Sequence, residues 1–79
     1  MSVEKIKEII RKYYELEILE ISEKEIVLKI PKELAERTCH PYLADKVLYY
    51  RKGEDIPDDL YKLYSLQDCQ RLAQLLSKL

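Results

Sequence analysis

The segment EILEISEKEIVLKI, residues 17–30, sets the architecture of the chain because it contains two short apolar runs joined by the polar residues 22–24. In the second run, residues 25–30, branched apolar side chains recur at every second position, which is the pattern of a β-strand with one buried face. The first run, residues 17–21, is less regular, and a bulge would place its isoleucines on one face. The short polar connection predicts an antiparallel hairpin.

The segment before the hairpin predicts an amphipathic helix from about Ser2 to Tyr14. Its apolar residues follow a 3-4-3 spacing, which places them on one helical face. The residues with this spacing are Val3, Ile6, Ile10 and Tyr13. A lone hairpin is only marginally stable in water, so we expect this helix to cover its apolar face.

The region between Pro41 and Gly53 fits two structures. A proline at the start, a glycine just past the end and basic residues close to that end are typical of a helix. The aromatic run at residues 46–52 is also typical of a third strand. The helix is the favoured interpretation, and the third strand is the alternative.

The last part of the chain predicts two helices. A proline followed by two aspartates at residues 57–59 suits a helix start. Ser65 and Asp68 then resemble a capping box ahead of a leucine-rich helix at residues 66–79. The predicted fold class is therefore α+β, with the N-terminal helix and the C-terminal helices packed on the antiparallel hairpin.

Length and charge limit the classes of function. With 79 residues the chain has room for one domain, residues 1–79, and a chain this short has a thin core. The 14 basic and 15 acidic residues give a net charge of -1, which does not favour nucleic-acid binding through an overall basic surface or a polybasic membrane anchor. No apolar run is long enough for a membrane span, and charges interrupt the N-terminal region where a signal peptide would be apolar.

We therefore expect a cytoplasmic protein without membrane contact. Its surface is rich in lysine and glutamate, and it has no asparagine, a composition that resembles heat-adapted proteins.

Residues with catalytic or ligand-binding chemistry are few. Cys39, His40 and Cys69 lack the spaced cysteine pairs of zinc domains, so we expect no metal and no cofactor. A disulfide between Cys39 and Cys69 is the alternative to two free thiols. Gly53 is the one glycine, which excludes a phosphate-binding glycine loop, and no hydrolase motif occurs. We predict no enzyme activity and no small-molecule substrate.

The leucine-rich C-terminal helix suggests an interaction surface. Its apolar residues exceed a single packing seam, and several lie near the free end of the chain. The predicted interface residues are Leu72, Leu75, Leu76 and Leu79. The sequence thus predicts a non-catalytic protein–protein interaction module, a homodimer or a small subunit of a larger assembly. The alternative is that these leucines complete the core of their own chain.

A nucleic-acid-binding surface is the second functional hypothesis. It combines aromatic rings, on which bases stack, with basic side chains that contact phosphates. The residues are Arg11, Lys12, Tyr49, Tyr50, Arg51 and Lys52. The alternative is that one tyrosine of the 49–50 pair, and one of the 13–14 pair, packs in the core. If residues 46–52 form a strand, the order of elements resembles that of double-stranded-RNA-binding domains, with residues 31–45 as an insertion; no family is assigned.

Overall fold

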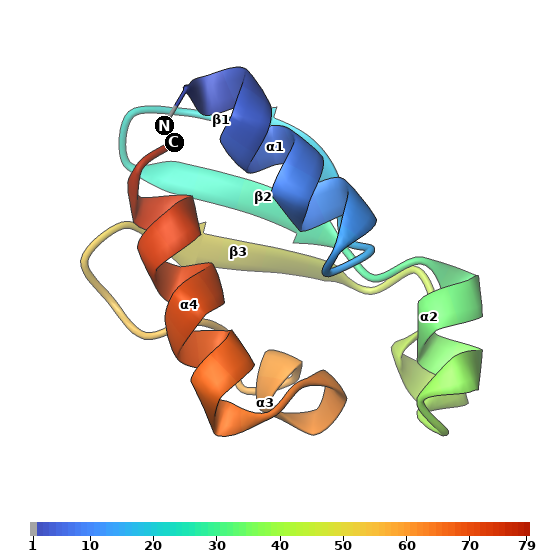
Figure 1. Cartoon of the computed structure of the whole chain (residues 1–79). Coiled ribbons are helices and arrows are strands. Elements are labelled where there is room, and N and C mark those ends of the chain that lie inside the picture. The colour runs from blue at the N-terminus through green and yellow to red at the C-terminus, as the bar shows by residue number, and fades with distance from the viewer. Residues whose placement is uncertain (1) are drawn as a thin grey trace.

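The computed structural model describes residues 2–79 and has the predicted α+β class, with one antiparallel sheet and helices at both ends of the chain (Figure 1). The sheet has three strands in the order β1-β2-β3. The strands are β1 (Glu17–Ile21), β2 (Glu25–Lys29) and β3 (Val47–Arg51). The helical segments are α1 (Val3–Lys12), α2 (Lys32–Arg37), the 3-10 turn η1 (Pro41–Leu43), α3 (Leu60–Leu63) and α4 (Leu66–Ser77).

The buried stripe of α1 is rotated from the predicted one. Ile6, Ile10 and Tyr14, spaced four residues apart, are fully buried. Val3 and Tyr13, which we predicted on the buried face, are 46% and 61% exposed. The spacing of four, continued into the residues just after the helix, gives a single stripe that faces the sheet.

The hairpin has the predicted form. β1 and β2 are antiparallel, and their register shifts between Ile18 and Glu20, which leaves Leu19 as the extra residue of a bulge. Ile18 pairs with Leu28, and Ile21 pairs with Ile26. Both isoleucines of β1 are therefore opposite buried residues of β2, as the predicted bulge required.

Residues 47–51 form the third strand, so the favoured helical interpretation of the region from Pro41 to Gly53 was wrong. Leu48 and Tyr50 are buried, and the side chains between them are exposed, because β2 offers an edge on which this alternation pairs. The two signals that favoured a helix belong to separate turns. Pro41 begins η1, and Gly53 adopts a φ of 91° in the turn after β3.

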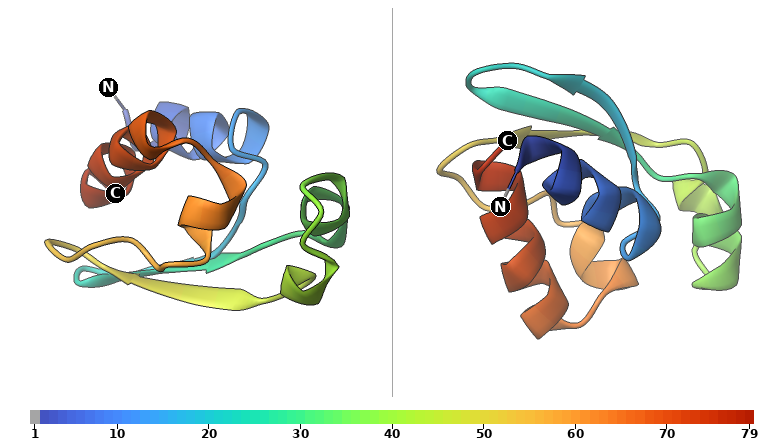
Figure 2. Two further views of the ribbon diagram at one scale, coloured as in Figure 1. Left: turned by 90° about the horizontal axis from the view of Figure 1, so that it is seen from below. Right: turned by 45° about the horizontal axis from the view of Figure 1, so that its top comes forward.

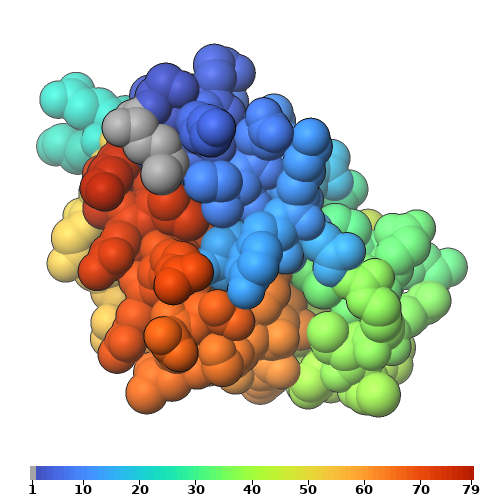
Figure 3. Space-filling view, in the orientation of Figure 1, coloured from blue at the N-terminus to red at the C-terminus, as the bar shows by residue number. Residues whose placement is uncertain are grey.

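The helices cover one face of the sheet. Figure 2 shows α1 and α4 together on the same side of the three strands, with α3 also on that side and α2 beyond the end of the sheet. In the space-filling view, α1 (blue) and α4 (red) lie against each other on the face toward the viewer (Figure 3). Within residues 2–79 no helix covers the opposite face of the sheet (Figure 2). The molecule therefore has two layers, with the core between them.

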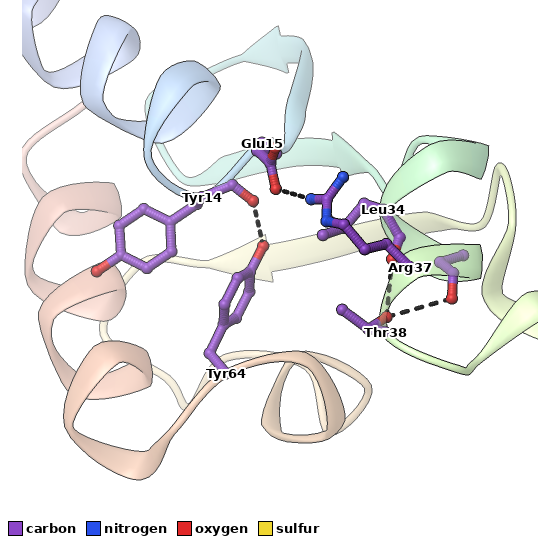
Figure 4. Close-up of polar contacts among 7 residues, drawn as sticks. Tyr14, Glu15, Leu34, Arg37, Thr38 and Tyr64 are labelled. Carbon is purple, nitrogen blue, oxygen red and sulfur yellow. Dashed lines mark hydrogen bonds and ion pairs between the residues drawn. The ribbon is translucent and has the colours of Figure 1, made fainter.

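Two polar contacts hold the end of α1 in place, and a third closes the neighbouring helix α2 (Figure 4). The Tyr64 hydroxyl, between α3 and α4, donates a hydrogen bond to the Tyr14 carbonyl. Arg37 of α2 forms an ion pair with Glu15. The Thr38 hydroxyl donates to a carbonyl of α2 at 2.8 Å and closes the C-terminus of that helix. The residues after α1 are thus joined to α2 on one side and to the segment between α3 and α4 on the other.

Candidate interaction surface

The leucines predicted as the interface lie inside the chain. Leu72 and Leu76 have no exposed surface, Leu75 is 8% exposed, and Leu79 is partly buried against the same core. Their side chains complete the contact of α4 with the rest of the core, as the alternative interpretation held. In this fold they offer almost no surface to a partner.

The predicted nucleic-acid residues are divided between two sides of the molecule. Tyr50 is 2% exposed and packs in the core, whereas Tyr49 and Arg51 are exposed on the uncovered side of the sheet. Arg11 and Lys12 lie in the last turn of α1, on the covered side. The sheet therefore separates the two groups, and they do not form one patch. Lys52 is partly exposed in the turn after β3.

In each of the two tyrosine pairs, one ring is buried and the other is exposed. Tyr14 and Tyr50 are buried, while Tyr13 and Tyr49 are each 61% exposed. The buried tyrosines provide the aromatic volume of a core without phenylalanine or tryptophan. Each pair therefore leaves one exposed ring, Tyr13 on the covered side of the sheet and Tyr49 on the uncovered side.

Both cysteines are free thiols, so the alternative of a Cys39–Cys69 disulfide is not realised. Cys69 is buried on α4, and its thiol lies 3.5 Å from the Leu60 carbonyl oxygen, to which it can donate. Burial raises the pKa of the Cys69 thiol, which favours the unreactive protonated form. Cys39 is exposed after α2, near His40. Within the described part of the chain no three His, Cys, Asp or Glu side chains are grouped to hold a metal ion.

The uncovered side of the sheet is the most distinctive surface of the molecule, and we call it the open sheet face. It consists of the strand residues that alternate with the buried ones. Its members are Glu17 and Glu20 of β1, Glu25, Val27 and Lys29 of β2, and Val47, Tyr49 and Arg51 of β3.

The centre of the open sheet face is apolar. Val27 is directly opposite Tyr49 in the register of β2 and β3, and Val47 lies one position along the same face of β3. Val47 is 38% exposed, and Tyr49 is among the most exposed apolar side chains of the described residues. Three adjacent apolar side chains are therefore in contact with solvent.

Charges surround this apolar centre. The Lys29 ammonium lies 3.6 Å from a carboxylate oxygen of Glu17 and 3.8 Å from one of Asp45. Glu25 is opposite Arg51 in the register, yet neither side chain has an ion-pair partner within 4.0 Å among residues 2–79. The face thus holds both signs of charge, and two of its charged groups are available to a partner.

A groove of about 390 Å³ lies between α1 and α4 on the covered side. Ile9 and Leu75 contribute apolar surface to it, and Arg71 and Lys78 contribute positive charge. No serine, cysteine or histidine in the part of the chain that the structure describes lines this groove.

Comparison of the chain with protein-family models, with curated protein sequences and with solved structures gives no match. Each helix among residues 2–79 is too short or too polar to cross a lipid bilayer. The open sheet face therefore has to be interpreted from its own residues. Two features of the sequence could have revealed it: the alternation in β3, and Val27 at a position of β2 otherwise occupied by charged residues.

Proposed function

We propose that the chain is a non-catalytic protein-interaction module that forms a homodimer through the open sheet face. The observation that supports this proposal is the apolar centre formed by the half-buried Val27 and the exposed Val47 and Tyr49, on a sheet that helices cover on one side only. Apolar surface on the uncovered face of a small sheet favours association, because contact with a partner removes it from water.

The size of the face indicates a weak dimer. Five-residue strands at about 3.3 Å per residue, and three strands about 4.8 Å apart, give a face of roughly 16 by 14 Å. This face is small beside the roughly 800 Å² per partner of a standard interface. We therefore expect reversible association, with a dissociation constant of about 10 to 100 µM.

Truncation of Tyr49 tests the proposal. Tyr49→Ser removes most of the exposed apolar surface at the centre of the face, while the monomer loses little packing because the ring is already 61% exposed. We expect the dimer to weaken at least about tenfold, measured by sedimentation velocity over a series of protein concentrations.

Tyr13→Ser is the matched control. Tyr13 has the same exposed fraction, 61%, but it lies at the end of α1 on the covered side. This variant keeps the association of the unchanged chain. A chain that stays monomeric at several hundred micromolar, or equal effects of the two variants, would contradict the proposal.

A further inference from the structure

The open face of β2 has an internal symmetry of charge. Along the strand it presents Glu25, Val27 and Lys29, which are acidic, apolar and basic in turn. The two charges lie at equal separations in sequence from Val27. Such a pattern is self-complementary when it meets its own copy in the reverse direction.

Two face-to-face arrangements place Val27 against its own copy. When the two β2 strands are parallel, Glu25 faces the Glu25 of the second copy, and Lys29 faces its Lys29, so both charges of β2 meet like charges. When the two strands are antiparallel, each Glu25 faces the Lys29 of the other copy. Like charges that face each other disfavour an interface, so charge selects the antiparallel arrangement.

The neighbouring strands fit this choice. The antiparallel arrangement has its two-fold axis across the strands, along the row that contains Val27 and Tyr49. Tyr49 therefore faces the Tyr49 of the second copy, and two aromatic rings in contact attract each other. Glu20, in the same row, faces its own copy at the solvent-exposed edge of β1, where solvent and salt screen the repulsion.

We infer that two copies pack open face to open face with antiparallel β2 strands, held by two intermolecular ion pairs between Glu25 and Lys29. The inference rests on the proposed dimer and adds its orientation. Packed sheets lie about 10 Å apart, a gap that a glutamate and a lysine extended from opposite sheets can close. Glu25 is available because it has no ion pair within residues 2–79, and Lys29 has only partners beyond 3.5 Å.

Charge reversal tests the orientation. Glu25→Lys places lysine against Lys29 of the second copy, and Lys29→Glu places glutamate against its Glu25. We expect each single variant to weaken the dimer at least about tenfold, and the double variant to recover most of the lost affinity. An equimolar mixture of the two single variants forms a heterodimer, because every facing pair in it has opposite charges. Sedimentation equilibrium measures the association of each single variant, of the double variant and of the mixture of the two single variants.

The outcomes separate this inference from the proposed function. If the unchanged chain dimerises and Tyr49→Ser abolishes the dimer, but the charge variants associate as the unchanged chain does, the orientation is wrong and the proposed function stands. Single variants that are monomeric and remain so when mixed also overturn the orientation. A monomeric unchanged chain contradicts both.

Folding is checked for each variant by far-ultraviolet circular dichroism, since Lys29→Glu lies beside Glu17 and Asp45. If a reversal prevents folding, Glu25→Gln and Lys29→Gln replace it, because glutamine removes the charge and keeps a polar side chain of similar length. Each glutamine variant weakens the dimer. Wild-type affinity in both would overturn the proposed ion pairs.

Discussion

Cys39 occupies a backbone conformation that suits glycine. Its φ is 64°, in the left-handed region, directly after the C-cap of α2. Its amide donates to the Glu36 carbonyl at 3.1 Å, and the next amide, of His40, donates to the Ala35 carbonyl at 2.8 Å. This is the hydrogen-bond pattern of a helix C-terminus that most often contains glycine.

Cys39→Gly is therefore expected to stabilise the protein by about 0.5 to 1 kcal/mol, because glycine adopts a positive φ without a steric penalty from Cβ. Cys39→Ala is the control, since it also removes the thiol but keeps a Cβ. Urea unfolding under reducing conditions measures both. Equal midpoints for the glycine and alanine variants would show that the backbone conformation at Cys39 carries no such cost.

The connection between the end of α1 and the segment before α4 depends on the Tyr64 hydroxyl, whose ionisation changes with pH. The Tyr64 hydroxyl is partly buried, and burial raises the pKa of this phenol above its ordinary value, with the charge of Glu15 adding to the rise. The folded protein therefore holds the Tyr64 proton more tightly than the unfolded chain does. This contribution to stability is fully present below about pH 10, the pKa of an unfolded tyrosine, and is lost as the pH rises above it.

Tyr64→Phe removes the hydrogen bond to the Tyr14 carbonyl. We expect a loss of about 1 kcal/mol at neutral pH, and a smaller further loss between pH 9 and 11 than the unchanged chain shows. Thermal unfolding followed by circular dichroism across this range gives both values. Tyr14, whose pKa burial also raises, still contributes to alkaline unfolding in the variant. An identical alkaline decline in both proteins would contradict a role for Tyr64.

Local patterns predicted most of the secondary structure. Ser65 caps α4 as predicted, and Ser2, where the first helix was predicted to begin, caps α1; each accepts a hydrogen bond at 3.2 Å from the amide three residues later. The bulge in β1 also followed from its sequence, because its two isoleucines needed a common face. These features depend on residues close together in the chain, which a sequence shows directly.

Features that depend on distant residues were harder to predict. The residues of β3 fit a helix as well as a strand when only the sequence is considered. They form a strand because the edge of β2 is available for pairing. The leucines of α4 were equally ambiguous, because a helix alone does not show whether its apolar face meets its own chain or a partner. The open sheet face escaped prediction because it combines side chains from three strands whose pairing the sequence does not state.

The distribution of apolar surface over the molecule supports association through the sheet. α4 places Leu72, Leu75 and Leu76 in the core. Among residues 2–79 the exposed large apolar residues are Val3, Tyr13, Leu19, Tyr42, Val47, Tyr49, Tyr61 and Leu66. Val47 and Tyr49 are on one strand and next to Val27, whereas Val3, Tyr42 and Leu66 belong to separate helical segments. The strands therefore contribute the adjacent apolar side chains that an interface needs.

The distribution of charge predicts that the chain does not retain nucleic acid. Tyr49 and Arg51 share the open sheet face with three glutamates, which repel phosphates, and Arg11 and Lys12 lie across the sheet from them. We expect no change in the fluorescence anisotropy of labelled single- or double-stranded oligonucleotides at low salt. The control is the variant Arg51→Glu with Lys52→Glu, which should behave as the unchanged chain does. A nucleic-acid-binding protein would instead show binding that weakens steeply with salt and that this variant abolishes. Phosphate contacts depend on the basic side chains, and their strength falls with salt because binding releases counterions.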